Sequence, residues 1–152
     1  MAAYQILIAD DHPLFRSALH QALSLGLGSE VQLAEAASIA ELEQRLTQKS
    51  DWDLVLLDLN MPGAHGFFGL VLLRGQYPQI PVVMISAQEE AAVISRSREF
   101  GASGFIPKSS SLEQIQQAVR AVLDGELWWP LPTDQEQTLS AEAKAASAGL
   151  AS

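Results

Sequence analysis

The sequence predicts an α/β protein with a doubly wound, five-stranded parallel sheet flanked by five helices. Short runs rich in Ile, Val and Leu alternate with longer stretches in which apolar residues recur every three to four positions, as is typical of parallel sheets. Three of the short runs are nearly continuously apolar, as expected of strands that helices cover on both faces. The chain of 152 residues is long enough for one domain with one core.

Residues that favour helix ends separate the predicted strands. Pro13 suits the first turn of a helix that continues to Leu25. The S-x-x-E spacing, in which each side chain caps the backbone amide of the other, occurs at residues 38–41 and again at 110–113. The predicted strands cover residues 5–9, 31–36, 54–58, 82–86 and 104–107, and the helices cover 13–25, a segment beginning near 38, 67–77, 88–101 and 110–125.

The composition changes at the end of this pattern. From Pro130 the chain is dominated by Ala, Ser, Gln, Glu and Thr and has almost nothing to bury, which is typical of a linker or a disordered tail. We expect a folded domain over residues 3–129 and a linker or tail over residues 130–152, leading to a further domain that this chain lacks. Trp128 and Trp129, just before the tail, are expected to pack or to dock a domain.

Composition and charge exclude several kinds of site. There are no cysteines, which excludes disulfides, thiol nucleophiles and Cys-based metal centres. No apolar run approaches the ~20 residues needed to cross a bilayer, and charged residues interrupt the first segment where a signal peptide needs an apolar core. We therefore expect a cytoplasmic protein with no membrane contact. The net charge of −9 repels phosphate backbones, so any DNA binding is expected to belong to another segment.

Polar residues accompany the ends of four predicted strands. Asp10 and Asp11 follow the first strand, Asp58 ends the third, Ser86 ends the fourth and Lys108 follows the fifth. Ligands of open α/β sheets bind beyond the carboxyl ends of the strands, so these side chains converge if their strands are neighbours. Three carboxylates in one place raise one another's pKa, and a divalent cation such as Mg²⁺, together with the lysine, removes that cost.

The same residues suit phosphoryl transfer. That chemistry requires a carboxylate nucleophile, a metal ion, an ammonium group and a hydroxyl donor. Asp58 is the candidate nucleophile, because the turn over residues 60–63 would leave its carboxylate exposed at the rim of the sheet. Taken singly, Asp10, Asp11, Ser86 and Lys108 would be ordinary surface residues, and Asp58 alone would favour neither interpretation. Their shared position, at the carboxyl ends of the predicted strands, favours phosphoryl transfer.

Four motifs add a family resemblance. The segments ADDHPLF, LLDLNMPGAHG, ISA and GASGFIPKS, in this order and spacing, resemble the receiver domain of two-component response regulators. The resemblance covers about residues 4–129 and is strongest to the subfamily joined to a LuxR/NarL-type helix-turn-helix domain. It implies a CheY-like, flavodoxin-like fold with strand order 2-1-3-4-5. It also implies control of transcription through an attached DNA-binding domain that is absent from this chain.

The resemblance implies roles for the acidic residues. Asp58 would accept a phosphoryl group from a phosphohistidine of a sensor histidine kinase. Asp11 and Asp58 would bind Mg²⁺ directly, Asn60 would add its backbone carbonyl, and Asp10 would act mainly through water. The protein would then not be an enzyme with a separate substrate, because its Mg²⁺-dependent phosphorylation and dephosphorylation would be confined to its own aspartate.

The remaining implied roles concern signalling. Ser86 and Lys108 would hold the phosphoryl oxygens, and Phe105 would be the aromatic switch that turns inward when Ser86 moves. The implied output is a reshaped surface around the fourth helix, the fifth strand and the fifth helix. This surface would serve as the interface of a homodimer.

Three other functions stay open at this point. A stand-alone receiver would signal by protein contact without DNA. An aspartyl-phosphate phosphatase of the haloacid-dehalogenase type usually needs a second Asp two positions after the nucleophile, where this chain has Asn60. A flavodoxin-type FMN carrier needs a phosphate-binding loop after the first strand, where the ADDHP segment would repel the FMN phosphate.

The other aromatic and histidine residues are interpreted as surface or structural residues. Phe67 or Phe68 is expected to be partly exposed, as a contact for a kinase, a partner domain or a second subunit. We expect His12, His20 and His65 to be surface or capping residues, because their spacing indicates no metal site.

Overall fold

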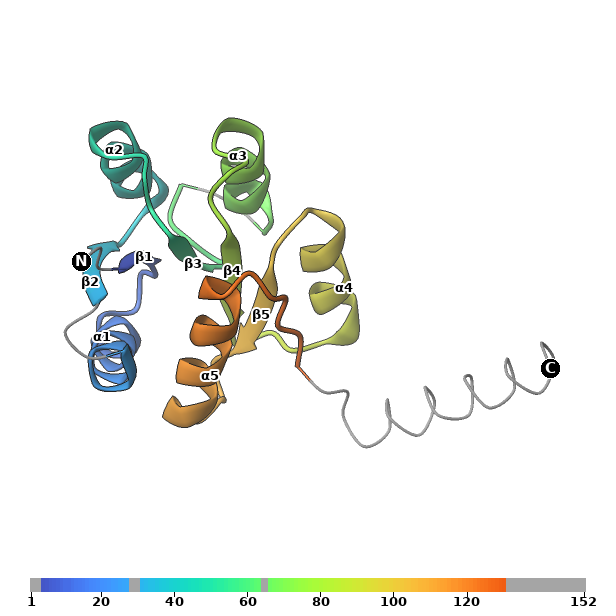
Figure 1. The fold of residues 1–152 in the computed structure, drawn as a ribbon. Coiled ribbons are helices and arrows are strands. Elements are labelled where there is room, and N and C mark those ends of the chain that lie inside the picture. The colour runs from blue at the N-terminus through green and yellow to red at the C-terminus, as the bar shows by residue number, and fades with distance from the viewer. Residues whose placement is uncertain (1–3, 28–30, 64–65, 131–152) are drawn as a thin grey trace, which may run out of the picture.

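The computed structural model describes residues 4–27, 31–63 and 66–130, and a central sheet with helices on both sides organises them (Figure 1). The strands lie in the order β2-β1-β3-β4-β5, and every pair is parallel. They are β1 (Tyr4–Ala9), β2 (Val31–Ala36), β3 (Leu54–Asp58), β4 (Val82–Ser86) and β5 (Gly104–Pro107). The predicted fold class and strand order are confirmed. Most of the predicted tail, from residue 131 onward, lies outside the described residues.

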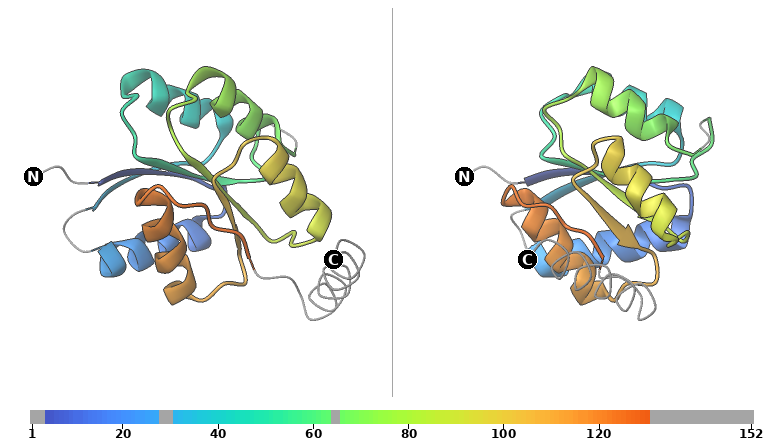
Figure 2. Two further views of the ribbon diagram at one scale, coloured as in Figure 1. Left: turned by 45° about the vertical axis from the view of Figure 1, so that its right-hand side comes forward. Right: turned by 90° about the vertical axis from the view of Figure 1, so that its right-hand side faces the viewer.

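Helices cover both faces of the sheet because successive strand residues point to opposite sides. Ile6 and Ile8 pack in the core with α1 and α5, whereas Leu7 and Ala9 belong to the core on the side of α2, α3 and α4 (Figure 2). None of the helices in the described residues is long and apolar enough to cross a membrane. The helices are α1 (Pro13–Leu27), α2 (Ile39–Gln48), α3 (Phe68–Gln76), α4 (Ala91–Glu99) and α5 (Leu112–Leu123).

The strand register brings the polar strand ends to one edge of the sheet. Asp58 lies opposite Ile85 of β4, and Ser86 lies opposite Pro107 of β5. The N–H of Lys108 continues this ladder by donating to the carbonyl oxygen of Ser86 at 2.9 Å. The convergence predicted from the sequence therefore follows from strand order and register.

The predicted start of α5 is wrong by one residue. The helix is capped by Ser111, whose Oγ accepts a hydrogen bond from the N–H of Gln114 at 3.1 Å. The Gln114 side chain accepts in return from the N–H of Ser111 at 2.9 Å, which completes a capping box. Ser110 is not the cap because it belongs to the preceding turn, where its N–H donates to the carbonyl oxygen of Pro107 at 3.0 Å.

The predicted start of α2 is confirmed, whereas one of its capping contacts and the start of α4 are corrected. Ser38 caps α2 by accepting from the N–H of Glu41 at 3.2 Å, as predicted, but the Glu41 carboxylate accepts from the N–H of Ala37 and not from that of the serine. Helix α4 begins at Ala91, later than predicted, because the preceding residue, Glu90, has an extended backbone and is the N-cap residue.

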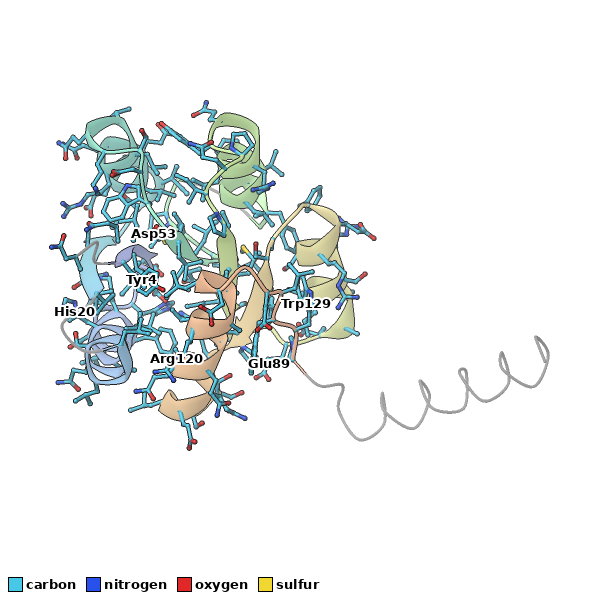
Figure 3. All side chains as sticks on the ribbon, viewed as in Figure 1. Tyr4, His20, Asp53, Glu89, Arg120 and Trp129 are labelled. Carbon is cyan, nitrogen blue, oxygen red and sulfur yellow. The ribbon has the colours of Figure 1, made fainter. Side chains whose placement is uncertain are left out.

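The chain after α5 returns along the free edge of β5. The N–H of Trp128 donates to the carbonyl oxygen of Ser103, and the N–H of Phe105 donates to the carbonyl oxygen of Trp128, each at 3.0 Å. The ring of Trp129 lies beside α4, with the Arg98 guanidinium 4.6 Å from its centroid (Figure 3). Both tryptophans therefore pack against the domain, in agreement with the first of the two roles expected for them.

At Gly104 the returning segment passes close to the backbone of β5. A Cβ at position 104 would lie 2.5 Å from the backbone oxygen of Trp128. We expect Gly104→Ala to lower the free energy of unfolding by about 1–3 kcal/mol, the usual cost of overpacking. In the control Gly75→Ala, nothing beyond the glycine's own helix backbone and chain neighbours lies within 4 Å of the added Cβ, so stability should rise by up to about 1 kcal/mol. Denaturant unfolding measures both changes, and equal effects would contradict the close approach.

Candidate functional site

Asp58 ends the central strand β3, between β1 and β4. The residue is 4% exposed. Its Oδ2 lies 3.4 Å from Lys108 Nζ and 3.6 Å from His12 Nδ1. Its Oδ1 accepts a long hydrogen bond of 3.4 Å from the N–H of Asn60. Groups from three separate segments of the chain thus meet at one buried carboxylate.

Asp10 and Asp11 follow β1 and lie next to that carboxylate. Asp10 is 1% exposed, and its Oδ1 accepts a hydrogen bond of 2.7 Å from the N–H of His12. One carboxylate oxygen from each of Asp10, Asp11 and Asp58, together with a ring nitrogen of His12, lie within 4.8 Å of one another. The structure therefore brings together the three predicted acidic residues.

Lys108 supplies the positive charge at this edge of the sheet. Its Nζ lies 3.0 Å from Asp10 Oδ2, 3.4 Å from Asp58 Oδ2 and 4.7 Å from the centroid of the Phe15 ring. The side chain is mostly buried, so its contacts with the carboxylates are screened less than those of a surface lysine. The predicted convergence of Lys108 on the acidic residues is present.

Ser86 and Phe105 are both fully buried. The Oγ of Ser86 accepts a hydrogen bond of 2.9 Å from the N–H of Gln88. In the described part of the chain, the hydroxyl hydrogen of Ser86 has no acceptor. The Phe105 ring belongs to the core on the side of α2, α3 and α4. Their roles in holding a phosphoryl group and in switching stay predictions.

His12 is an exposed residue, as predicted, but the expectation that it belongs to no metal site needs correction. Its side chain is 61% exposed, but Nδ1 points into the acidic cluster. This nitrogen lies 3.0 Å from Asp10 Oδ1, 3.1 Å from Asp11 Oδ1 and 3.0 Å from Lys108 Nζ. Spacing between histidines could not reveal this position. Its place directly after two strand-end aspartates was the available signal.

The sequence also predicts the exposure of the other two histidines and of the pair Phe67 and Phe68. His20 lies on α1, with its Nδ1 3.2 Å from a surface carboxylate, and so is a surface residue as predicted. His65 lies outside the described residues. Phe68 is 53% exposed, whereas the Phe67 ring packs on Phe100 with 5.4 Å between centroids. The expected partial exposure at this pair is confirmed.

Burial is the main cause that raises the pKa of the Asp58 carboxyl above its ordinary value. The neighbouring Asp10 carboxylate raises that pKa further, because two negative charges repel each other. Lys108 and the N–H of Asn60 act in the opposite direction by favouring the ionised form. The domain thus holds a carboxylate that is costly to ionise in the absence of additional positive charge.

Two buried oxygens in the cluster are suited to a metal ion. Asp10 Oδ2 and Asp11 Oδ1 have no hydrogen-bond donor among the described residues. Asp10 Oδ2 does lie 3.0 Å from Lys108 Nζ, so the two groups attract by charge without hydrogen-bond geometry. Buried carboxylate oxygens without donors are ligands that hard divalent cations take. The residues present therefore fit Mg²⁺, and three carboxylates could hold it.

Comparison with known proteins decides the family. The family described as response regulator receiver domain matches residues 6–120, from β1 into α5. This chain belongs to that family. Membership agrees with the acidic strand ends and the buried lysine, and it favours a receiver over the flavin carrier and the phosphatase considered from the sequence.

Individual relatives support the LuxR/NarL type of receiver. A glycerol metabolism activator from Pseudomonas putida is 47% identical over 128 residues, which cover 84% of this chain and 57% of the relative. The signal receiver domain of NarL from Mycobacterium tuberculosis is 31% identical with a TM-score of 0.71, covering 83% of this chain and 100% of that structure. A LuxR family DNA-binding response regulator from Silicibacter pomeroyi is 31% identical with a TM-score of 0.72. The match covers 84% of this chain and 96% of that structure. The chain spans about half the length of the curated relatives it matches.

Proposed function

We propose that Asp58 accepts a phosphoryl group from a phosphohistidine of a sensor histidine kinase. The observation that carries this proposal is the position of its carboxylate, buried at the carboxyl edge of the sheet with the Lys108 ammonium 3.4 Å away. An Asp58 oxygen attacks phosphorus, so a P–O bond forms and the P–N bond of the donor breaks. The electron pair of the broken bond stays on the imidazole nitrogen of the kinase, which takes up a proton.

Lys108 and Ser86 serve the transferred group. The Lys108 ammonium neutralises a phosphoryl oxygen, and the Ser86 hydroxyl, whose hydrogen has no acceptor in the described residues, donates to another. Phe105 follows Ser86 as the switch residue. The N–H of Phe105 donates to the carbonyl oxygen of Trp128 in the segment that returns along β5. A movement of Phe105 would therefore shift this segment, which leads out of the domain.

The acidic residues hold Mg²⁺ in this proposal. Asp11 and Asp58 are direct ligands, Asn60 adds its backbone carbonyl and Asp10 acts through water. When bound, the ion supplies positive charge for the phosphoryl oxygens. The donor-free oxygens of Asp10 and Asp11 support this ligand set. The chemistry stays on Asp58 of the same chain, including hydrolysis of its own acyl phosphate, so no separate substrate is turned over.

Phosphorylation controls a homodimer surface formed by α4, β5 and α5, in a protein of the cytoplasm. Control of transcription then requires a DNA-binding domain outside this chain. This output is supported by the DNA-binding relative from Silicibacter pomeroyi and by the length of the curated relatives, about half of which this chain spans. A receiver that acts by protein contact alone would lack that further domain.

Mapping the modified residue tests the acceptor. The protein is incubated with acetyl phosphate and Mg²⁺, and borohydride then reduces any acyl phosphate to an alcohol that survives proteolysis. Peptide mapping should find the reduced side chain at Asp58. Reduction at Asp10 or Asp11 in its place would overturn the assignment.

Lys108→Ala is expected to leave phosphoryl loading detectable but to remove phosphate-dependent dimerisation. The ammonium provides the contact between Asp58 and the end of β5. Without it, the phosphoryl group has no charged contact through which to change the dimer surface formed by α4, β5 and α5. Sedimentation of loaded and unloaded protein measures the effect. Lys49→Ala is the control, because that lysine pairs with the exposed Asp51 at 2.6 Å and is not part of the acidic cluster. Unchanged phosphate-dependent dimerisation in Lys108→Ala would refute the role.

A further inference from the structure

We propose that His12 is a metal-selectivity residue, whose imidazole adds a nitrogen ligand that lets the acidic pocket bind transition-metal ions such as Zn²⁺ and Ni²⁺ as well as Mg²⁺. The inference rests on the proposed function in one respect, namely that a cation binds in the acidic pocket. It extends that proposal by assigning a ligand from this chain that prefers a different class of ion.

The orientation of the ring is the first observation. Nδ1 of His12 lies 3.0 Å from Asp10 Oδ1, 3.1 Å from Asp11 Oδ1 and 3.6 Å from Asp58 Oδ2. The side chain is nonetheless more than half exposed, so solvent alone could satisfy the ring. The ring thus places one nitrogen among three carboxylates, where it can serve either as a donor to them or, in the Nε2-protonated tautomer, as a further ligand beside them.

The contact with Lys108 indicates which kind of group binds beside Nδ1 of His12. Lys108 Nζ is 3.0 Å from the same His12 nitrogen. An ammonium has only hydrogens to donate, so Nδ1 accepts from Lys108 in the tautomer that carries its proton on Nε2, whereas a proton on Nδ1 would be donated to Asp10 Oδ1. In the Nε2-protonated tautomer, lone pairs from the imidazole and from the carboxylates surround one place, and a cation satisfies all of them. In the described residues the ammonium fills this role, and a divalent ion would satisfy the same donors.

Spare ligand capacity is the second, independent observation. Asp10 Oδ2 belongs to a side chain that is 1% exposed, and it has no hydrogen-bond donor among the described residues. Carboxylates and water suit Mg²⁺, whereas an imidazole nitrogen suits Zn²⁺, Ni²⁺ and Cu²⁺. A pocket with both kinds of donor is expected to bind the second group of ions more tightly through His12.

Calorimetric titration of the metal-free protein with ZnCl₂, NiCl₂ and MgCl₂ in separate experiments tests this ligand. His12→Asn should weaken Zn²⁺ binding by about tenfold or more and Mg²⁺ binding by clearly less. The control His20→Asn removes a histidine of similar exposure that faces a single carboxylate, and it should leave the affinity of the pocket for all three ions unchanged. Nitrogen NMR of His12 should show Nδ1 shifting on addition of Zn²⁺ but not of Mg²⁺.

Two results would overturn the inference. Unchanged Zn²⁺ affinity in His12→Asn would show that the imidazole is not a ligand. An equal loss of Zn²⁺ and Mg²⁺ affinity, with no Zn²⁺-specific shift of Nδ1, would show that the ring only supports the carboxylates. Failure of the proposed function would appear elsewhere, as absent Mg²⁺-dependent loading of the wild-type protein, because loading does not enter the titrations.

Discussion

Asp58→Asn should abolish phosphoryl loading and, at the same time, make the domain more stable at neutral pH. The amide has almost the shape of the carboxylate, so the fold is kept, but it lacks the nucleophilic oxygen. The substitution also removes a negative charge that is buried and lies beside Asp10, the two causes that raise the pKa of Asp58. Loss of that unfavourable charge is expected to raise the free energy of unfolding in the absence of metal.

The pH dependence of this gain follows from the direction of the pKa shift. A raised pKa means that the folded state binds the Asp58 proton more tightly than the unfolded chain does. The stability contributed by this carboxyl is therefore present at low pH and is lost as the pH rises from about 3.9, the ordinary value, through the folded pKa. In chelator, the advantage of Asp58→Asn should be largest near pH 7 and shrink toward pH 4.

Urea unfolding at both pH values measures this difference. At pH 7, Mg²⁺ is expected to reduce the difference in unfolding free energy between Asp58→Asn and the wild type. The ion favours the ionised Asp58 carboxylate, which only the wild-type protein has. An asparagine variant that is less stable than the wild type at pH 7 in chelator would contradict the electrostatic description of the site.

Phe105→Ala should produce the largest loss of stability among single substitutions at the proposed signalling residues. The ring is fully buried in the core on the side of α2, α3 and α4, and its removal leaves a cavity there. Truncation of a buried phenylalanine costs about 3–5 kcal/mol, against a total stability of about 5–15 kcal/mol for most domains. Denaturant unfolding should therefore show a strongly lowered midpoint with the slope nearly unchanged.

Phe68→Ala is the matched control for that measurement. Phe68 begins α3 and is 53% exposed, so its loss should cost less than about 1 kcal/mol. Similar costs for the two substitutions would mean that Phe105 does not occupy a closely packed position. A small cost at Phe105 alone would indicate that its ring is readily replaced, as expected if it already spends time outside the core.

The strands and the main site residues could be predicted because a single physical pattern determines both. Runs such as Leu54–Asp58 and Val82–Ser86 are apolar throughout and end in one polar residue. Burial on both faces explains the first property, and the ligand-binding edge of a parallel sheet explains the second. Asp58 and Ser86 can therefore be identified as candidate site residues from their positions in the sequence.

Details that depend on local hydrogen bonds or on distant segments could not be predicted in this way. Three consecutive serines, 109–111, offer equivalent caps for α5, and only the turn closed by Ser110 selects the last of them. The Nδ1 atom of His12 contacts Lys108, 96 positions later in the chain, and the local sequence does not reveal that contact. The pairing of Trp128 with β5 depends on the absence of a side chain at Gly104.

Intact-mass spectrometry after incubation with acetyl phosphate, with Mg²⁺ or with chelator, tests the phosphoryl-acceptor role most directly. The wild-type protein should gain a single phosphoryl group in Mg²⁺ and little or none in chelator, and Asp58→Asn should gain none in either. An adduct that persists in Asp58→Asn, or no adduct on the wild-type protein under any condition, would contradict the role of Asp58 and leave the acidic pocket to another ligand.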